Sequence, residues 1–211
     1  MTARISSGLA AATRIAAGDD RTHYDAVARA LHWVTAALVL LQFVLAQLWG
    51  FFPRPERHLM IVGHMSFGIL LTAALVARIG WRLMPGHQVR AAVSGWVELA
   101  SKAMHYVLYV LLAAEAALGF LARWSEDAAM SFFGLLIASP LPPLPRAAHR
   151  LLLQTHDWIA WAIVLLAAAH ALAALFHHFV LRDDVLWRML PGRRARRVEM
   201  QATRPEEAWR G

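Results

Sequence analysis

The chain has 211 residues, of which 59% are hydrophobic, and its mean hydropathy is +0.45. A soluble domain of this length has an apolar share of about 45–50%, so the excess predicts helices that face lipid. The chain has no cysteine, which excludes disulfides, iron–sulfur clusters, thiolate zinc sites and haem attached through a Cys-x-x-Cys-His motif. The net charge of +7 fits either nucleic-acid binding or a membrane protein with basic residues on one side.

The chain starts with a polar segment of mixed charge, residues 1–29. It has no apolar core of about 7–15 residues before a small-residue cleavage site, so we do not expect a signal peptide. We assign residues 1–29 to an N-terminal tail, residues 30–190 to a transmembrane domain, and residues 191–211 to a basic C-terminal tail.

Four long apolar runs follow the tail, and each approaches or exceeds the about 20 residues that cross a bilayer as a helix. They are residues 30–49, 59–83, 103–124 and 156–181. The link 50–58 is short, the link 84–102 is polar with a surface helix expected near its end, and residues 125–155 form a longer, proline-containing loop. The sequence therefore predicts an all-α integral membrane four-helix bundle.

The basic residues are divided unequally between the two sides of these runs. Sixteen of the 21 lie on the side of the two tails and the 84–102 link, and five lie on the other side. By the positive-inside rule, this predicts a multi-pass protein of the bacterial inner membrane with both termini in the cytoplasm. No nucleic-acid partner is expected, because the basic residues flank spans and do not form one patch with interleaved aromatic residues.

Four histidines fall at two matched depths of the predicted bundle. His32 lies near the cytoplasmic end of the first helix, and His64 lies in the outer half of the second. His156 and His170 share the fourth helix, about 21 Å apart along its axis and within about 40° of one stripe. Depth pairs His64 with His156 and His32 with His170, which suits two haems, each between two imidazoles and each adapted to electron transfer.

Other uses of membrane histidines must be weighed. A single one is as often a hydrogen-bonded packing residue, but ionisable groups in spans are costly, and four at two depths favour a function. A zinc transporter would need carboxylates at ligand distance, and only Asp157 adjoins a candidate histidine.

Two basic residues near the cytoplasmic end are further candidates. Arg78 follows His64 by fourteen residues on the same stripe, so it either binds a propionate of the inner haem or snorkels to the headgroups. His177 follows His170 by seven residues and lies within about 20° of its stripe. Its ring either contacts a quinone carbonyl or lies among the headgroups.

The remaining titratable residues are less informative. Glu115, in the middle of the third span, is either a proton-handling group or a buried neutral acid. His105 is expected to be a hydrogen-bonding neighbour of the inner site. His58, His87 and His149 are expected to be solvated loop residues.

Several short motifs share the spacing of a known family. They are Leu31-His32-Trp33, Gly63-His64-Met65-Ser66-Phe67-Gly68, His105 with Leu108-Tyr109, and the spacing of His156, His170 and His177-His178. Over about residues 24–192 they resemble the bacterial cytochrome b561 family of four-helix di-haem membrane proteins. The outer segment Gly50-Phe51-Phe52-Pro53-Arg54 and the closing segment Leu186-Trp187-Arg188-Met189-Leu190-Pro191 are similar to its superoxide oxidase branch.

The resemblance implies an activity and a set of site residues. Members of this branch oxidise superoxide at the outer face and pass the electron through two b haems to ubiquinone. The implied iron ligands are His32, His64, His156 and His170, and the implied quinone contact is His177. Glu115 stands where the family often has proline.

The outer arginines bear on the superoxide reaction. We expect Arg54 and Arg57, with Arg146 and Arg150, to act at the catalytic face as a positive funnel that steers the anion. The alternative is that they are ordinary loop arginines.

Three functions follow from these observations. The one we adopt is a superoxide:ubiquinone oxidoreductase in contact with membrane lipid. The second is a quinol-linked electron-transfer subunit that delivers electrons to a periplasmic redox protein without superoxide chemistry. The third is a haem-free transporter or scaffold.

Overall fold

The computed structural model describes residues 24–85, 95–183 and 185–190. Four of its helices are long and apolar enough to cross a membrane. They are α2 (Ala26–Leu48), α3 (Arg54–Leu83), α4 (Trp96–Trp124) and α5 (Arg146–Phe176). Shorter elements are the 3₁₀ turns η1 (Trp49–Phe51) and η3 (Trp187–Met189), the π-helical turn η2 (His177–Leu181), and the strands β1 (Met130–Phe132) and β2 (Leu135–Ile137). The predicted four-helix membrane fold is confirmed.

Local sequence explains where several of these helices begin and end. The Asp25 carboxylate caps α2 by accepting the N–H of Ala28 at 2.8 Å. Pro53 precedes α3, and Pro145 precedes α5, where the missing N–H of proline costs no helical hydrogen bond. Arg182 ends η2 in the left-handed region, at φ 56°.

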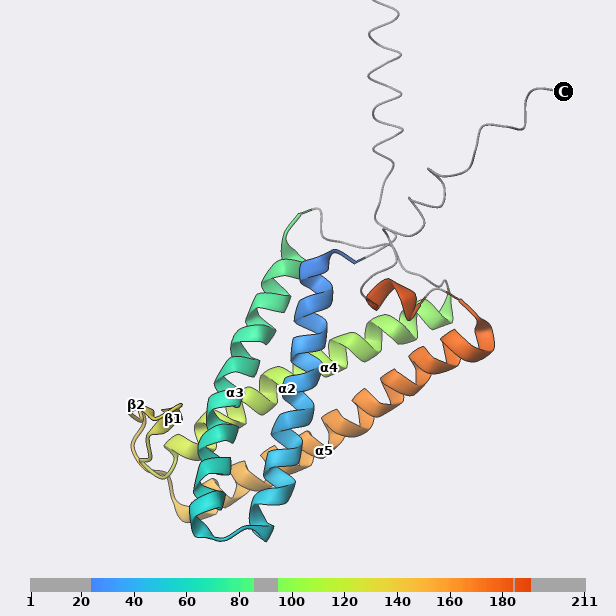
Figure 1. The fold of residues 1–211 in the computed structure, drawn as a ribbon. Helices are drawn as coiled ribbons and strands as arrows, with labels where there is room; N and C mark the ends of the chain where they lie inside the picture. Colours follow the sequence, from blue (N-terminus) through green and yellow to red (C-terminus); the bar gives the residue numbers. More distant parts are fainter. Residues whose placement is uncertain (1–23, 86–94, 184, 191–211) are drawn as a thin grey trace, which may run out of the picture.

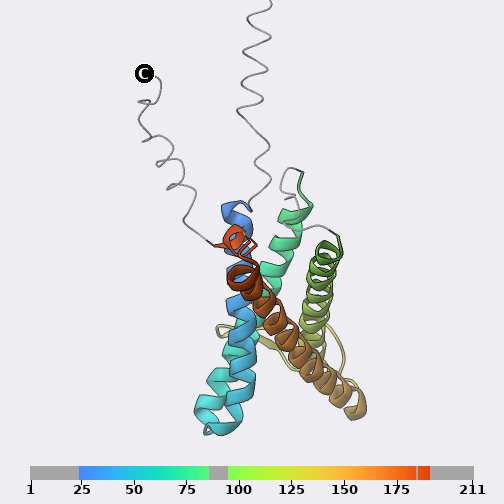
Figure 2. The ribbon, with the colours of Figure 1, turned by 90° about the vertical axis from the view of Figure 1, so that its right-hand side faces the viewer.

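The helices form two antiparallel pairs. Figures 1 and 2 show α2 and α3 side by side, with α4 and α5 forming a second pair that is tilted against the first. Large apolar side chains remain exposed along all four helices, Leu40, Val76, Val110 and Leu165 among them. Such faces are what helices surrounded by lipid require.

One end of the bundle carries the start of α2, the end of α3 and the turn η3, and we call it the inner end (Figure 1). The opposite, outer end carries η1 and the two strands. The terms describe position in the fold. Residues 1–23 and 191–211, which make up most of the two predicted tails, lie outside the described residues.

A β-hairpin at the outer end was not predicted. Strands β1 and β2 pair antiparallel, with Met130 opposite Ile137, around a turn in which Phe133 and Gly134 both have positive φ. The Phe133 N–H donates to the hydroxyl of Ser66 on α3 at 2.8 Å, and the Phe133 ring meets Phe67 edge-on at 5.6 Å. The hairpin therefore packs on α3 two residues beyond His64.

Three predicted boundaries were wrong. The link predicted for residues 50–58 ends at Pro53, because α3 starts at Arg54. The loop predicted for residues 125–155 ends at Pro145, because α5 starts at Arg146, and its middle contains the hairpin. Residues 96–102, predicted as part of a surface helix, form the first turns of α4. In each place, polar residues extend a helix beyond its apolar run, and the end of the apolar run was mistaken for the end of the helix.

Candidate functional site

The structure brings the four candidate histidines together in two pairs. Near the inner end, the rings of His32 on α2 and His170 on α5 have centroids 6.5 Å apart and planes at 69°. Nearer the outer end, His64 on α3 and His156 on α5 have centroids 6.3 Å apart and planes at 84°. Helix α5 therefore contributes one member to each pair, and the first two spans contribute the others.

These separations can be compared with what a shared metal requires. A metal about 2 Å from one nitrogen of each imidazole places the ring centroids roughly 6 Å apart, since each nitrogen lies about 1 Å from its centroid. Both pairs meet this requirement, and two imidazoles are a donor set that iron in a b-type haem accepts. The residues fit the group, and the assignment of the four histidines as ligands stays a prediction.

His64 makes the second contact that a ligating histidine usually makes. Its Nδ1 lies 3.2 Å from the backbone oxygen of Gln42 on α2, and its ring meets Trp49 edge-on at 5.2 Å. When Nδ1–H donates to the carbonyl, the ring has the tautomer whose Nε2 lone pair is free for a metal. Gln42 also lies against Gly68, where a Cβ would come within 2.7 Å of its amide nitrogen.

His156 lies against α4. Its Nδ1 is 3.2 Å from Oε1 of Glu115, and a Cβ at Gly119 would lie 3.3 Å from its Cε1. The sequence placed Glu115 at mid-span without a partner, and the structure places it beside the outer histidine pair.

The inner pair has basic neighbours. Arg78 donates from Nη2 to Nδ1 of His32 at 2.9 Å, and its guanidinium lies over the Tyr109 ring at 5.2 Å from the centroid. His105 approaches His170 with ring centroids 5.0 Å apart, and its Nδ1 lies 2.6 Å from the Ser101 carbonyl oxygen. His105 is thus a neighbour of the inner pair.

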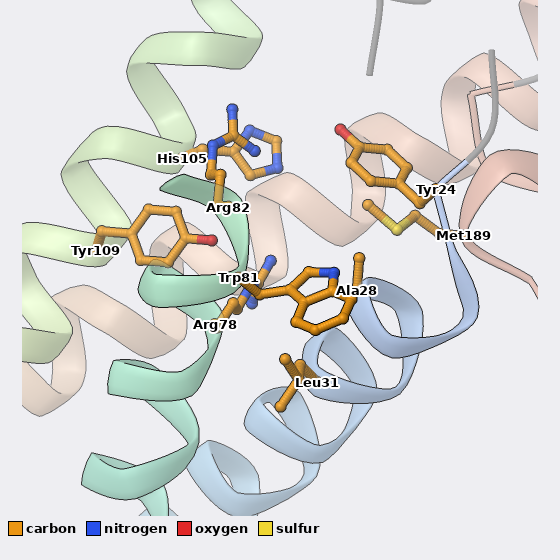
Figure 3. Close-up of a pocket in the computed structure, with 9 residues that line it drawn as sticks. All are labelled: Tyr24, Ala28, Leu31, Arg78, Trp81, Arg82, His105, Tyr109 and Met189. Carbon is orange, nitrogen blue, oxygen red and sulfur yellow. The ribbon is translucent and has the colours of Figure 1, made fainter. Parts of the chain in front are cut away.

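A small cavity of about 30 Å³ opens beside the inner pair (Figure 3). Side chains from α2 and the segment just before it, and from α3, α4 and η3, converge on it: Tyr24, Ala28, Leu31, Arg78, Trp81, Arg82, His105, Tyr109 and Met189. Trp81 is held there by the Asp25 carboxylate, to which its Nε1 donates at 3.0 Å. The sequence-based interpretation missed Trp81, Arg82 and Tyr109, although Arg82 follows Arg78, and Tyr109 follows His105, by one helical turn.

His177 has an acidic partner that was not predicted. Its Nδ1 lies 2.5 Å from Oδ2 of Asp183, just beyond the π-helical turn, and the other carboxylate oxygen accepts the N–H of Val185 at 3.1 Å. Burial acts to raise the pKa of the Asp183 carboxyl, but the hydrogen bonds from His177 and Val185 outweigh it and lower the pKa below its ordinary value. The imidazole of His177 is therefore oriented by a carboxylate.

The outer arginines surround the start of α3 and of α5. Arg54, Arg146 and Arg150 have exposed side chains. Arg57 is exposed too, but its guanidinium donates to the carbonyls of Phe52 at 3.2 Å and Gly50 at 3.4 Å. Arg57 thus braces the turn that carries Trp49, the residue packed on His64.

The prediction that His149 is a solvated loop residue was wrong. It lies in the first turn of α5, with Nδ1 2.7 Å from the buried Ser125 hydroxyl and Nε2 3.0 Å from Glu126 Oε1. The contact needs the end of α4 and the start of α5 to meet, which no local pattern reveals. His58 is exposed as predicted but lies in α3, and His87 lies outside the described residues.

Fold and site together define a class of protein: a four-helix membrane protein with facing histidine pairs at two depths. Residues 23–192 match the family model described as prokaryotic cytochrome b561. The chain belongs to this family, so it is a bacterial membrane electron-transfer protein of a family that binds b-type haem.

Several relatives are similar over most of their length. Cytochrome b561 homolog 2 of Escherichia coli (strain K12) is 33% identical over 177 residues, which cover 79% of this chain and 90% of that protein. The protein named probable superoxide oxidase CybB of Yersinia pestis is 29% identical over 175 residues, with 81% and 97% covered. Cytochrome b561 homolog 1 of Escherichia coli (strain K12) is 29% identical over 173 residues, with 78% and 94% covered.

Proposed function

We propose that the chain is a di-haem membrane enzyme that oxidises superoxide at the periplasmic face and passes the electrons through two b haems to ubiquinone. The observation that carries the proposal is the two facing imidazole pairs, with centroids 6.3 and 6.5 Å apart. The relative named probable superoxide oxidase supports the choice of reaction, because nearly all of its length aligns with this chain. Each bound haem supplies a one-electron centre.

The reaction balances with two superoxide ions for each quinone. Each superoxide ion gives up one electron and leaves as dioxygen. Ubiquinone takes up the two electrons and two protons to become ubiquinol. Superoxide is supplied from the periplasm and ubiquinone from the membrane.

In this proposal, the paired histidines hold the two haems. His64 and His156 bind the outer haem, and His32 and His170 bind the inner one. Each imidazole ligates through Nε2 when Nδ1–H donates to a neighbouring oxygen, as His64 can do to Gln42. Arg78 lies beside the inner pair and supplies positive charge for a propionate.

The outer arginines attract the substrate. Arg54, Arg57, Arg146 and Arg150 are exposed around the outer ends of α3 and α5. Positive charge around an entry point raises the encounter rate with an anion, and the effect falls as salt is added. Arg57 also braces the turn that contains Trp49, and Trp49 packs on His64 of the outer pair.

His177 binds the quinone in this proposal. Asp183 accepts Nδ1–H, so with both ring nitrogens protonated the imidazole also has Nε2–H to donate to a quinone carbonyl. The ring lies seven residues, or about two turns, beyond His170, in the turn η2 that continues α5 at the inner end. Electrons delivered to the inner haem would then have a nearby acceptor.

The proposal includes an orientation. The distribution of Lys and Arg supports an inner-membrane protein with both tails, 1–29 and 191–211, in the cytoplasm and the di-haem domain at residues 30–190. The outer pair then lies toward the periplasm, where superoxide arrives.

A superoxide pulse tests the function. Purified chain in detergent, with haem content measured by the pyridine haemochrome method, receives superoxide without oxygen, and haem absorbance is followed. We expect rapid reduction close to the diffusion limit, followed by reoxidation when ubiquinone is added. Slow reduction would instead support the quinol-linked subunit that serves a periplasmic redox protein, and colourless protein that takes up no haem would contradict both.

The role of the arginines has its own control. Neutralising Arg54 and Arg57 together by glutamine should slow superoxide-driven reduction several-fold at low salt and flatten its salt dependence. Lys102→Gln also removes an exposed positive charge, but at the inner end, and should leave the rate unchanged. Equal rates in all three proteins would contradict the funnel.

A further inference from the structure

A carboxyl group faces the outer histidine pair from the middle of a span. Glu115 on α4 is 15% exposed and His156 on α5 is 24% exposed, and Oε1 of the first lies 3.2 Å from Nδ1 of the second. An ionisable group in the middle of a membrane span is energetically costly and is therefore a candidate for a functional role. The group that Glu115 faces indicates what this role is.

Both groups lack an aligned hydrogen bond. Oε2 of Glu115 and Nδ1 of His156 are buried and make no well-aligned hydrogen bond within the part of the chain that the structure describes, although the Glu115 backbone carbonyl also lies near the imidazole. A buried polar atom left unpaired costs about 1–3 kcal/mol, so a small rotation of the imidazole toward Glu115 is favourable. The distance allows the bond, and only its angle has to improve.

The surface of α4 is shaped to receive the ring. Gly119 lies one turn beyond Glu115, and a Cβ there would come within 3.3 Å of Cε1 of His156. The absence of a side chain lets the imidazole approach the helix at the height where the carboxyl reaches it. Two independent features of α4, one steric and one polar, thus point at the same ring.

We propose that Glu115 is the positioning residue of His156, with its carboxyl oxygen accepting the Nδ1–H of the imidazole. This hydrogen bond selects the tautomer whose Nε2 lone pair is free, aims that nitrogen toward His64, and makes it a stronger donor to iron. The inference rests on the proposed function, in which His64 and His156 hold a haem. Metal-bound histidines commonly donate their second N–H to a carboxylate or a carbonyl.

The proposal makes the outer pair asymmetric. His64 donates to a peptide carbonyl of Gln42, whereas His156 donates to a carboxyl group. A carboxylate is a stronger acceptor than a peptide carbonyl, so it increases the donor strength of the imidazole and favours the oxidised iron. Glu115 therefore affects both the affinity and the reduction potential of the outer haem. It leaves the affinity and the reduction potential of the inner haem unchanged, because it does not contact the inner pair.

Haem titration of the apo-protein in detergent tests the proposal. Glu115→Leu should weaken the binding of one haem by roughly tenfold to hundredfold and leave the other unchanged. Glu115→Gln, which keeps an acceptor oxygen, should stay within about threefold of the parent. Glu56→Leu is the matched control, because it removes an exposed carboxyl from the first turn of α3, eight residues before His64, and it should change neither affinity.

A variant that lacks the outer haem identifies which of the two haems is affected by Glu115. In His64→Ala, which keeps the inner haem, adding Glu115→Leu should not change the affinity of the haem that remains. If Glu115→Leu in the parent leaves both affinities unchanged, the inference is overturned while the proposed function stands. If the parent chain binds fewer than two haems, the proposed function itself fails.

A second measurement covers the case in which Glu115→Leu does not fold, as shown by loss of both haems. Redox titration of Glu115→Gln should then show a higher midpoint potential for one haem only, because a neutral amide oxygen is a weaker acceptor than a carboxylate oxygen. Two unchanged potentials would overturn the proposal.

Discussion

The Arg78 guanidinium donates a hydrogen bond to the His32 imidazole. This bond is incompatible with the proposed role of His32 as a haem ligand. A guanidinium can only donate, so Nδ1 of His32 is the acceptor at 2.9 Å. A ligating imidazole instead carries a proton on Nδ1. In the proposed function, haem binding at the inner pair would therefore require Arg78 to leave His32, and the released guanidinium would become available to a propionate.

This exchange leads to a prediction about Arg78→Met. The substitution removes a charge-assisted hydrogen bond of about 1.5–3 kcal/mol, so the inner haem should bind roughly tenfold to hundredfold more weakly. The outer haem should be unaffected. Haem titration measures both affinities. Tighter binding of the inner haem would contradict the prediction, since it would mean that Arg78 mainly competes with iron for His32.

Single histidine substitutions test the pairing. His64→Ala and His156→Ala should lose the same haem, and His32→Ala and His170→Ala should lose the other, because each iron needs both imidazoles of its pair. Absorbance and redox titration distinguish the two haems. The control is His105→Ala, which alters a neighbour of the inner pair and should keep both haems. Loss of one and the same haem in the His32 and His156 variants would show that the pairing is wrong.

At the scale of elements, the hairpin depends on one buried hydroxyl of α3. Ser66 is fully buried and accepts the N–H of Phe133 at 2.8 Å, and its single hydroxyl proton is shared between the carbonyl oxygens of Val62 at 2.7 Å and Ser131 at 3.2 Å. It therefore satisfies backbone groups of a non-helical segment that packs against a spanning helix, where unsatisfied groups are costly. Because Ser66 follows His64 by two residues, the hairpin also braces the outer part of α3.

We accordingly expect Ser66→Ala to destabilise the hairpin selectively. The lost partners should cost about 1–3 kcal/mol. Hydrogen exchange of residues 130–137 should become faster, and the thermal midpoint should fall. Thr72→Ala is the matched control, because among the described residues the Thr72 hydroxyl bonds only the Gly68 carbonyl of its own helix, at 2.9 Å. Equal exchange in the two variants would show that Ser66 does not hold the hairpin.

At the scale of the whole molecule, the distribution of charge bears on the orientation in the membrane, and the pairing of helices determines which side chains are in contact. The unequal distribution of Lys and Arg along the sequence predicts which end of the bundle faces the cytoplasm. The tilt between the α2–α3 pair and the α4–α5 pair determines which side chains meet (Figures 1 and 2). The proposed direction of electron flow requires both, because the outer pair must face the side where superoxide arises.

The absence of cysteine allows a direct test of orientation. Single cysteines at the exposed positions Lys102 and Arg150 lie at opposite ends of the bundle. In intact spheroplasts, a membrane-impermeant maleimide should label Arg150→Cys and reach Lys102→Cys only after permeabilisation. The reverse pattern would place the outer histidine pair in the cytoplasm and contradict the proposed reaction.

Much of the fold was predictable, because apolar run length and charge asymmetry are local properties of the sequence. These two properties predicted the four helices, and the fourteen-residue spacing predicted that His156 and His170 lie on one face of the fourth helix. The hairpin was not predictable in the same way. Its strands have three residues each, and their main partner, Ser66, is about 65 residues away in sequence.

The sequence by itself determined the class of fold, the family and the position of each histidine along its helix, since rise per residue converts residue number into distance along a helix axis. Only the tertiary structure decided which groups touch: Glu115 with His156, Arg78 with His32, and His149 with Ser125. These contacts depend on the rotation and tilt of one helix against another. Rotation and tilt follow from packing along the whole interface, which no single segment of the chain encodes.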